Sequence, residues 1–492
     1  GGGRVKLTDL LSRCPEARLD GDGDREIAGI THDSRQVRDG LIFAALPGMK
    51  SHGCEFLGAA VEAGAVAELS DAEPQTGFDL PWIRSARPRR DMAAMAWALA
   101  GDPQTDLRLV GITGTNGKST TASLVGQLLD TGGLPTAVIG TLGAQLGGRP
   151  IAESERTTPE STDLAPMLRA AVDRGAVAAA MEVSSHSLMQ DRVAGLEFEV
   201  AVWTNLTRDH LDYHHDMESY FAAKRRLFDD HLAPGGRRVL PVDDPWGARL
   251  LDEPVDGDLS WGLDRGDVCA RELRSDLEGS VFELRLPEGS VDVRLPLVGI
   301  HNLRNALAAA AVAHACGIGP AAIAEGFAGA RPLTGRLERV AVDLHLPVFV
   351  DYAHTPEGLR AVLQSLARIT DRRLIVVFGA GGDRDRGKRG PMGFAVGQLA
   401  DVAVVTSDNP RSEDPAAIAA AVAAGVEAAG KVPVIELDRR TAICRAIELA
   451  DENSLILVAG KGHEATQTIG DRRIPFSDQI VIREEAGRAP CS

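Results

Sequence analysis

Residues 111–120, GITGTNGKST, combine the residue types that bind the phosphates of a nucleotide. Lys118 brings a positive charge, and Ser119 or Thr120 offers a hydroxyl oxygen to a phosphate-bound Mg²⁺. Apolar residues precede this segment, and an apolar-periodic stretch, ASLVGQLLDT, follows it. Backbone N–H groups at the start of a helix there would point at an anion, and the helix dipole adds partial positive charge. The pattern predicts a strand, a glycine-rich turn and a helix around a triphosphate.

The turn is a shortened variant of the strict P-loop pattern, which requires a glycine where Ile112 stands. A chance Gly-Lys-Ser in a surface loop is the alternative, but strand, glycines, lysine, hydroxyl and helix fall in the required order. A dinucleotide site is less well supported, because no GxGxxG follows the strand. The expected phosphate-binding residues are Gly114, Thr115, Asn116, Gly117, Lys118, Ser119 and Thr120.

Four apolar runs after this helix, PTAVIGT, AVAAAMEVSSH, FEVAVWTNLTRDH and RRVLPVDD, predict a parallel sheet covered by helices on both faces. Ligands of such sheets lie beyond the carboxyl ends of the strands. Glu182 stands at one of these ends, where a carboxylate beside a polyphosphate suits a Mg²⁺ ligand and where a solvent-facing carboxylate is the alternative. The polar residues expected at this edge are Thr157, Thr158, Glu182, Ser184, His186, Asn205, Thr207, Asp209 and His210.

The segment NLTRDHLDYHH holds His210, His214 and His215 together with Asp209 and Asp212, which also suggests zinc. Neither HExxH nor CxxC is present, and a phosphate site calls for Mg²⁺ with oxygen ligands. A zinc hydrolase stays as a minor alternative.

Five further strands, PVFVDYA, RLIVVFGAGG, VAVVTSDN, VPVIEL and LILVAGKG, predict a second parallel sheet. A charged group follows each strand, so one crevice at the carboxyl edge is expected to gather them. These groups are Asp351 with His354, Asp383 with Arg384, Asp408 through Arg411, Asp438 with Arg439, and Lys461 through Glu464.

The length of 492 residues favours about three domains, all of the α/β class. Residues 1–104 predict a smaller N-terminal α/β domain, residues 105–336 a central domain with a P-loop-type parallel sheet, and residues 337–492 a C-terminal Rossmann-like parallel sheet. Residues 268–299 predict an antiparallel extension of the central domain. A helix follows, and His301 or Asn302 is expected to cap its start.

The bulk composition excludes several functional classes. A net charge of −17 disfavours nonspecific binding to nucleic acid or to an anionic membrane. Six cysteines without CxxC or metal-ligand spacing indicate free thiols in a reducing cytoplasm. No apolar run is long enough to cross a bilayer, and residues 1–15 lack the apolar core of a signal peptide. The sequence therefore predicts a cytoplasmic protein without membrane insertion, expected to be a monomer.

Eight motifs together resemble the Mur ligase family: GTNGKST, MEVSSHSL, TNLTRDHLDYH, GIHNLRNALAA, DYAHTPEGL, GAGGDRDRGKR, DNPRSEDP and GKGHE. They run in unbroken order over essentially the whole chain. The resemblance implies an ATP-dependent amide ligase of peptidoglycan precursor synthesis. ATP would phosphorylate a carboxylate of UDP-N-acetylmuramoyl-L-alanyl-D-glutamate, and the amine of diaminopimelate would attack the acyl phosphate, which yields an amide, ADP and phosphate.

The resemblance also implies roles for individual residues. It gives Lys118, Glu182, His210 and Lys224 to catalysis, with Ser119, Glu182, His210 and a carbamylated Lys224 as Mg²⁺ ligands. Without the family, Lys224 would be interpreted as an ordinary helix-surface lysine. The resemblance adds Asn302, Arg336 and Asp351 to the ATP site. It assigns Ser34, Met49, Lys50, Ser51, Thr157, Thr158, Ser184, Gln190 and Arg192 to the UDP-sugar peptide, and Arg384, Asp408, Asn409, Pro410, Arg411, Gly460 and Glu464 to diaminopimelate.

The motif DNPR favours diaminopimelate over lysine, because Arg384 and Arg411 can grip the distal carboxylate that lysine lacks while Glu464 receives the ammonium. Catalysis is expected to need closure of the third domain onto the second. Two alternatives remain open at this stage. One is another Mur or folylpolyglutamate-type ligase, and the other is a P-loop regulatory ATPase that forms no amide.

Overall fold

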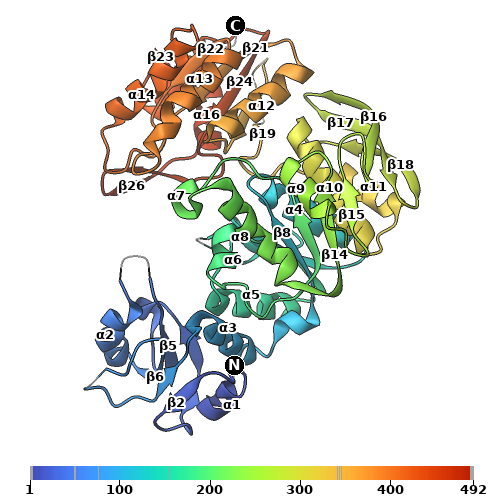
Figure 1. Cartoon of the computed structure of the whole chain (residues 1–492). Coiled ribbons are helices and arrows are strands. Elements are labelled where there is room, and N and C mark those ends of the chain that lie inside the picture. The colour runs from blue at the N-terminus through green and yellow to red at the C-terminus, as the bar shows by residue number, and fades with distance from the viewer. Residues whose placement is uncertain are drawn as a thin grey trace. The chain divides into compact units, whose positions relative to one another are not determined.

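The computed structural model describes residues 4–48, 51–75, 77–154, 156–340, 342, 344 and 346–487. The chain divides into two compact units, of which the first comprises residues 1–269, 286–288 and 307–326 and the second residues 270–285, 289–306 and 327–492. Two large sheets lie in the first unit and one in the second, and helices accompany each (Figure 1). The predicted α/β class is confirmed, while the domain boundaries at residues 104 and 336 stay predictions.

The central sheet has the order β11-β10-β9-β12-β8-β13-β14-β15, and the strands from β9 to β15 in this order are parallel. Its central strands are apolar on both faces, as a sheet covered on both sides requires. The antiparallel strands β10 and β11 at one edge were not predicted. The strands are β8 (Arg108–Thr113), β9 (Thr136–Gly140), β10 (Gly143–Leu146), β11 (Arg149–Ala152), β12 (Ala178–Glu182), β13 (Phe198–Trp203), β14 (Leu232–Pro241) and β15 (Leu259–Trp261).

The helices of the central sheet bury apolar faces against it. In the helix after β8, Leu124, Val125, Leu128 and Leu129 are almost fully buried, as the periodicity predicts. The helices are α4 (Lys118–Thr131), α5 (Ser161–Asp173), α6 (Ser185–Met189), α7 (Leu211–His214), α8 (Met217–Asp229) and α9 (Pro245–Leu251).

The N-terminal sheet has the order β2-β7-β6-β5-β4, with β2 antiparallel to β7 and the others parallel. A small antiparallel pair, β1 with β3, lies outside it. The elements of this region are β1 (Val5–Lys6), α1 (Leu7–Leu11), β2 (Arg18–Asp20), β3 (Glu26–Ile27), β4 (Gly29–Thr31), β5 (Leu41–Ala45), α2 (Leu57–Glu62), β6 (Ala65–Ser70), β7 (Trp82–Arg84) and α3 (Pro88–Leu99).

The predicted antiparallel extension is a three-stranded sheet of β16 (Cys269–Asp276), β17 (Gly279–Leu286) and β18 (Gly289–Leu295). Helices α10 (Ile300–Ala315) and α11 (Pro320–Ala328) follow. The predicted cap of α10 is wrong, because the helix already begins at Ile300. The N–H of Ile300 donates to Ser365 Oγ at 2.8 Å, and Asn302 Nδ2 donates back to Val298 O at 2.9 Å.

The C-terminal sheet has the order β19-β20-β24-β21-β22-β23. The five predicted parallel strands are confirmed, and β19 adds an antiparallel edge. Figure 1 shows helices against this sheet in orange and red. The elements are β19 (Glu338–Arg339), β20 (Val348–Asp351), α12 (Pro356–Ile369), β21 (Arg373–Phe378), α13 (Arg389–Leu399), β22 (Val402–Val405), α14 (Pro415–Ala428), β23 (Val434–Ile435), α15 (Arg439–Glu448), β24 (Ser454–Ala459), β25 (Thr466–Ile469), β26 (Arg472–Pro475) and α16 (Asp478–Ala486).

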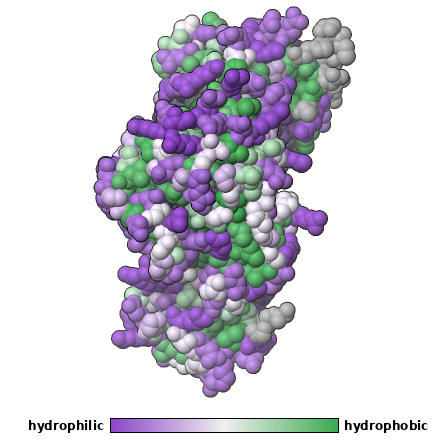
Figure 2. Space-filling model, turned by 90° about the vertical axis from the view of Figure 1, so that its right-hand side faces the viewer, coloured by the Kyte–Doolittle hydropathy of each residue, from purple (hydrophilic) through white to green (hydrophobic). Residues whose placement is uncertain are grey.

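Among the residues that the structure describes, no helix is both long and apolar enough to cross a membrane. The face seen in Figure 2 carries hydrophilic residues throughout, and its hydrophobic residues form smaller scattered groups.

The N-terminal sheet buries one carboxylate without a cation. Glu68 in β6 is fully buried, and its Oε1 accepts a hydrogen bond from Cys54 Sγ at 3.5 Å. Its Oε2 has no hydrogen-bond partner within the described part of the chain. Burial raises the pKa of Glu68 from its ordinary 4.5 to about 7. Between these two pH values the folded state holds a proton that the unfolded chain releases, so stability falls as pH rises through this window.

We expect Glu68→Gln to remove this pH dependence, because the amide carries no charge to desolvate. At pH 8 the variant should unfold with a free energy higher than wild type by about 2 kcal/mol, and near pH 4.5 the two should match. Urea denaturation across this range measures the effect, with the exposed Glu62→Gln as control. A Glu68→Gln curve that follows the wild-type pH dependence would contradict the assignment.

Candidate active site

The loop between β8 and α4 has the backbone of a phosphate cradle. Gly114 and Gly117 have φ angles of 147° and 85°, a region that favours glycine. A Cβ at Gly114 would lie 1.9 Å from Thr204 Oγ1, so a side chain there would close the loop. Helix α4 begins at Lys118, and its first N–H groups lack carbonyl partners within the helix. The loop therefore fits an anion, as the sequence predicts.

The Lys118 ammonium lies over this loop, where Nζ donates to the carbonyl oxygens of Gly114 and Thr115, each at 2.9 Å. Two threonine hydroxyls nearby, Thr113 Oγ1 and Thr121 Oγ1, are buried without a hydrogen-bond partner in the described part of the chain. A cation above a turn of backbone donors is the arrangement that binds polyphosphate.

Lys224, on α8, is the least expected member of the site. Its side chain is fully buried, and Nζ donates to Gly114 O at 2.8 Å and lies 4.7 Å from the centre of the Tyr220 ring. Burial lowers the pKa of Lys224 well below the ordinary value, and the charge of Lys118 lowers it further. The interpretation as a helix-surface lysine is therefore wrong.

Residues that follow β13 hold the loop in place. Thr204 Oγ1 and Asn205 Nδ2 donate to Asn116 O at 2.7 and 2.9 Å, and Asn116 N donates to Asn205 Oδ1 at 3.0 Å. Thr207 N donates to Thr115 Oγ1 at 3.0 Å. The sequence predicted Asn205 and Thr207 at this edge of the sheet, but not their contact with the loop.

Glu182 ends β12, whose register places it opposite Ile112 of β8, two residues before Gly114. Its carboxylate is almost fully buried and accepts from Thr141 N at 2.8 Å. The solvent-facing alternative for Glu182 is therefore wrong. Thr141 Oγ1 also donates to Thr157 Oγ1 at 3.2 Å, so this threonine, absent from the sequence prediction, connects Glu182 with Thr157.

The remaining residues predicted to bind a sugar peptide, which lie before α5 and at the two ends of α6, form one hydrogen-bonded group. Thr158 Oγ1 donates to Glu182 O at 2.9 Å and accepts from Ser184 N at 3.0 Å. Arg192 donates to Thr158 O at 3.2 Å and to Gln190 Oε1 at 2.6 Å. The structure thus brings Thr157, Thr158, Ser184, Gln190 and Arg192 together beside Glu182.

Glu160 binds three arginines, and sequence reasoning missed it. Its carboxylate, 2% exposed, lies 2.8 Å from Arg89 Nη1, 2.9 Å from Arg156 Nη1 and 3.0 Å from Arg192 Nε. One negative charge therefore faces three positive ones, which leaves an excess of positive charge beside Thr158. Arg89 lies 71 residues from Glu160 in the chain, so no local pattern signals the contact.

The predicted metal ligands differ in how well they fit a cation. Glu182 and the Ser119 hydroxyl offer the oxygen atoms that Mg²⁺ prefers. His210 has φ of 52° and packs edge-on against His186 with ring centres 5.1 Å apart. Lys224 as an ammonium cannot ligate a metal, so its inclusion requires modification. Across the described ranges, no group of three or more His, Cys, Asp or Glu side chains is arranged to hold a metal, so the zinc alternative gains no support.

No hydrogen bond joins Ser34 or Ser51, the described N-terminal residues of the prediction, to this group. Ser34 begins a 3₁₀ turn after β4, and Ser51 O accepts from Gly48 N at 3.2 Å. Near Ser34, Thr162 Oγ1 lies 3.4 Å from His32 Nδ1, which connects the N-terminal region with α5. Met49 and Lys50 lie outside the described residues.

In the second unit, the predicted arginines flank a glycine after β21. A Cβ at Gly381 would lie 3.0 Å from Arg411 Nη1 and 3.9 Å from Arg384 Cγ. Arg411 donates to Gly382 O at 2.6 Å and has φ of 52°, while Arg384 is exposed. The side chains of both arginines therefore pass close to Gly381, after β21.

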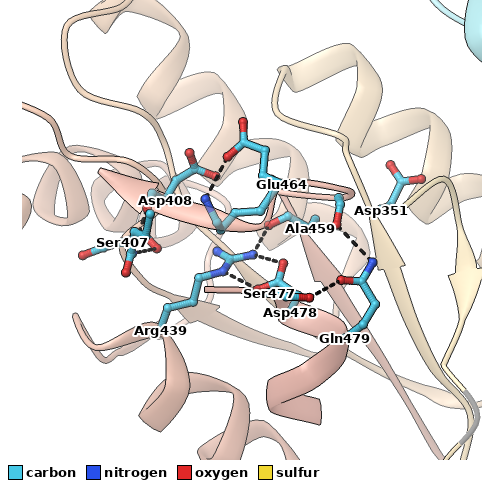
Figure 3. Close-up of polar contacts among 12 residues, drawn as sticks. Asp351, Ser407, Asp408, Arg439, Ala459, Glu464, Ser477, Asp478 and Gln479 are labelled. Carbon is cyan, nitrogen blue, oxygen red and sulfur yellow. Dashed lines mark hydrogen bonds and ion pairs between the residues drawn. The ribbon is translucent and has the colours of Figure 1, made fainter. Parts of the chain in front are cut away.

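The acidic and amide groups gather at the ends of β22 and β24. Asn409 Nδ2 donates to Glu464 Oε2 at 2.8 Å. Asp408 is buried, and its Oδ2 has no hydrogen-bond partner in the ranges that the structure describes. Gly460 has φ of 116°, and a Cβ there would lie 2.7 Å from Asp408 Oδ2. Pro410 is buried between Asn409 and Arg411. Figure 3 shows Asp408 and Glu464 together at this edge of the sheet.

One pair predicted for this crevice does not belong to it. Asp438 caps α15 by accepting from Thr441 N at 2.8 Å. Arg439 is 0% exposed and forms a two-pronged ion pair with Asp478, in which Nε and Nη2 donate to the two carboxylate oxygens at 2.8 Å each (Figure 3). Although both residues follow a strand, Asp438 caps a helix and Arg439 pairs with a buried carboxylate.

The three residues predicted to add to the ATP site also lie in the second unit. The Asp351 carboxylate accepts from Leu337 N and Ala353 N at 2.7 Å each. The Arg336 guanidinium stacks on the Tyr352 ring, 4.6 Å from its centre. Asn302 lies next to His301 in the chain. The charge of Asp351 acts to raise the pKa of His301, but burial of the ring lowers that pKa overall.

A parallel sheet that delivers a glycine-rich loop and a lysine to a helix start defines a P-loop-type nucleotide-binding protein. Three family models match the chain: the Mur ligase middle domain at residues 112–313, the Mur ligase, glutamate ligase domain at residues 335–462, and the Mur ligase family, catalytic domain at residues 26–99. The chain belongs to the Mur ligase family. It is an ATP-dependent ligase that forms amide bonds and acts in peptidoglycan precursor synthesis.

Several relatives match over almost their full length. The chain is 41% identical over 483 residues to UDP-N-acetylmuramoyl-L-alanyl-D-glutamate--2,6-diaminopimelate ligase of Syntrophomonas wolfei, covering 98% of this chain and 99% of the relative. It is 43% identical to the protein of the same name from Streptomyces coelicolor, covering 98% and 97%. A solved structure of a ligase with this name superposes with a TM-score of 0.69 at 32% identity and covers both chains completely.

We expect Glu160→Gln to destabilise the first unit, because the amide leaves three guanidinium groups without the carboxylate that compensates them. The free energy of unfolding should fall by about 2 kcal/mol, less than for a fully buried pair since Arg156 is half exposed. Chemical denaturation measures the change, with the exposed Glu153→Gln as the matched control. Equal stability of the two variants would refute the role of Glu160.

Proposed function

We propose that this protein joins diaminopimelate to UDP-N-acetylmuramoyl-L-alanyl-D-glutamate. The observation that carries the proposal is a group of charged residues in the second unit, which we assign as the amino-acid pocket. Two arginines flank Gly381 there, and two carboxylates follow β22 and β24, the strands on either side of β21. An amino acid with an extra carboxylate and an extra ammonium suits this combination of charges. The names of the relatives from Syntrophomonas wolfei and Streptomyces coelicolor support the same substrates.

The selection of diaminopimelate over lysine follows from the arginines. Lysine carries the distal ammonium that Asp408 or Glu464 can accept, but it has no distal carboxylate for Arg384 and Arg411. A guanidinium forms two parallel hydrogen bonds with a carboxylate, and their loss leaves a desolvated charge unpaired. Lysine is therefore expected to bind more weakly.

For the nucleotide sugar, the excess positive charge around Glu160 supports an anionic peptide. Arg192, Thr158 and Ser184 are already positioned by mutual hydrogen bonds, which lowers the entropy lost on binding. Arg89 and Arg156 extend the positive surface next to them. We assign the dipeptide carboxylates to this group, and the uridine end to the region of Ser34 and Ser51.

The reaction proceeds through a phosphorylated carboxylate. A carboxylate resists attack by an amine, because its charge repels the nucleophile and oxide is a poor leaving group. Transfer of a phosphoryl group from ATP removes both obstacles. Lys118 and the N–H groups at the start of α4 stabilise the charge that gathers on the transferring phosphoryl group. The amine then attacks the acyl carbon, the amide forms, and phosphate leaves.

Mg²⁺, when bound, would neutralise phosphate charge, and Glu182 and Ser119 are the oxygen donors that suit it best. His210 and a carbamylated Lys224 are proposed for a second ion. Carbamylation needs an uncharged amine, which the low pKa of Lys224 supplies. The amine nitrogen bonds to the carbon of CO₂ and releases a proton, and the product is a carboxylate-like group. We also propose that the protein acts as a monomer in the cytoplasm.

A ligation assay tests the proposal. Pure protein with ATP, Mg²⁺ and the nucleotide-sugar dipeptide should form an amide with diaminopimelate and far less with lysine, while Lys118→Ala should form none. Faster product with lysine would overturn the choice of amino acid. Phosphate release that depends on a folate in place of the nucleotide sugar would identify another ligase of the superfamily, and ATP turnover without any acceptor would indicate a regulatory ATPase.

We expect Arg411→Ala to weaken the use of diaminopimelate specifically. Its KM for this amino acid should rise about tenfold or more, since a charged hydrogen bond to the distal carboxylate is lost, while the KM for ATP stays unchanged. Steady-state kinetics measures both constants, with the exposed Arg368→Ala on α12 as control. An unchanged KM for diaminopimelate would rule out this role.

We expect turnover to depend on dissolved CO₂ through Lys224. Exhaustive removal of CO₂ should lower the wild-type rate several-fold, and added bicarbonate should restore it, because an ammonium or free amine cannot replace the carbamate. Lys224→Ala should be slow in both conditions, and Lys6→Ala, at an exposed position, should behave as wild type. Equal wild-type rates with and without CO₂ would exclude the carbamate.

A further inference from the structure

Lys461, in the segment after β24, is a charged residue whose side chain is 0% exposed. Its Nζ lies 2.8 Å from Glu464 Oε2 and 3.2 Å from Asn409 Oδ1. It therefore contacts two of the residues assigned to the amino-acid pocket from the side away from solvent. None of the roles assigned so far uses this ammonium.

The contacts of Lys461 determine how Asn409 and Glu464 are oriented. Asn409 Oδ1 accepts from both Lys461 Nζ and Thr468 N, so its amide nitrogen must face Glu464, where Nδ2 donates to Oε2. Glu464 Oε2 thereby receives two donors, from Asn409 and Lys461. The other carboxylate oxygen, Oε1, is the one left to accept an ammonium from a ligand.

The backbone on both sides of Lys461 is held by a buried network (Figure 3). Before it, Ala459 O accepts from Arg439 Nη2 at 3.0 Å, and Arg439 is fixed by Asp478. After it, Gly462 O accepts from Gln479 Nε2 at 3.1 Å. The segment 459–464 is thus hydrogen-bonded to the first residues of α15 and α16. Because this backbone is held in place, the Lys461 side chain has a fixed position relative to Asn409 and Glu464.

This network contains one more carboxylate than it contains cations. Its cations are Arg439 and Lys461, and its carboxylates are Asp408, Glu464 and Asp478. Asp408 Oδ2 is buried without a hydrogen-bond partner within the described ranges, so this oxygen can still accept a hydrogen bond. One ammonium from a ligand would complete the set.

We propose that Lys461 is a positioning residue that sets specificity for the ammonium of the incoming amino acid, by locking Asn409 and directing Glu464 Oε1 into the pocket. This inference rests on the proposed function and identifies a determinant of its amino-acid site. The electrostatics agree with the geometry. Burial acts to raise the pKa of Glu464, but the hydrogen bond and charge of Lys461, the hydrogen bond from Asn409 and the charge of His463 together lower that pKa, which favours the ionised acceptor.

The test is the kinetics of Lys461→Met, which keeps the length of the side chain and removes the ammonium. The KM for the amino acid should rise about tenfold or more, while kcat changes by less than about threefold and the KM for ATP is unchanged. Lys431→Met is the matched control, because Lys431 Nζ also donates a hydrogen bond within the same unit, in its case to the backbone carbonyl of Ala400. Equal effects of the two substitutions on the amino-acid KM would overturn the proposal.

A double-mutant cycle separates positioning from a general structural role. If Lys461 acts through Glu464, Lys461→Met should have little further effect on the amino-acid KM in a Glu464→Gln background. A full additional effect would refute the mechanism. Should Lys461→Met alone fail to fold, the double variant still removes both charges of the pair together, and its KM compared with Glu464→Gln gives the same decision.

The outcome is independent of which amino acid the wild type uses. If wild-type protein uses lysine and not diaminopimelate, the proposed substrate is wrong, yet the cycle can be measured with lysine, which also carries a distal ammonium. If the wild type uses diaminopimelate and Lys461→Met leaves its KM unchanged, only the inference about Lys461 fails.

Discussion

The free-energy cost of removing charge from water governs both units of this protein. A buried ion survives only when another charge and several hydrogen bonds compensate its lost hydration. Arg439 and Asp478 meet most of this requirement, because both carboxylate oxygens accept from the guanidinium and neither side chain is exposed, although Arg439 Nη1 has no hydrogen-bond partner among the described residues. Glu160 meets it three times over. Glu160 pairs directly with Arg192, and Arg439 donates to the carbonyl of Ala459, so both groups hold segments that contain or adjoin predicted substrate residues.

Two positions where compensation is incomplete are positions to which function is assigned. Lys224 is buried against a carbonyl and an aromatic ring, no carboxylate of the described residues is bonded to it, and a second ammonium shares its carbonyl. The resulting preference for a neutral amine is costly for folding and useful for chemistry, which is the usual relation between perturbed groups and active sites. Asp408 is the mirror image in the second unit, a buried carboxylate with one oxygen unmatched. Each imbalance suits the group proposed to bind there: a carbamate needs the uncharged amine, and the carboxylate needs an ammonium.

The sequence was sufficient to predict features that depend on the order of residues within one short segment of the chain. The strand, turn and helix around Lys118, the strands that end at Glu182 and Asp408, and the grouping of Arg384 with Arg411 all follow from apolar runs and the edge rule of parallel sheets. The sequence was insufficient to predict ion pairs whose two residues come from distant segments of the chain. Arg89 with Glu160 and Arg439 with Asp478 are such pairs, separated by 71 and 39 residues. The interpretation of Lys224 as an ordinary helix-surface lysine failed for the same reason, because its partner is the phosphate loop, which lies far from it in the chain.

A charged residue at a strand end is an ambiguous signal for a related reason. Asp438 and Arg439 come after β23 just as Asp408 and Asn409 come after β22, and from sequence they are equivalent. The number of residues before the next helix distinguishes the two pairs. Helix α15 begins at Arg439, so Asp438 caps the helix, and Arg439 forms an ion pair with Asp478. After β22 no helix begins until Pro415, and the intervening residues turn their polar groups towards Glu464 and Gly460. The length of the connection between strand and helix therefore decides whether a strand-end charge becomes a cap or a ligand, because a cap must lie within the first turn while a binding group needs backbone that is not committed to the helix.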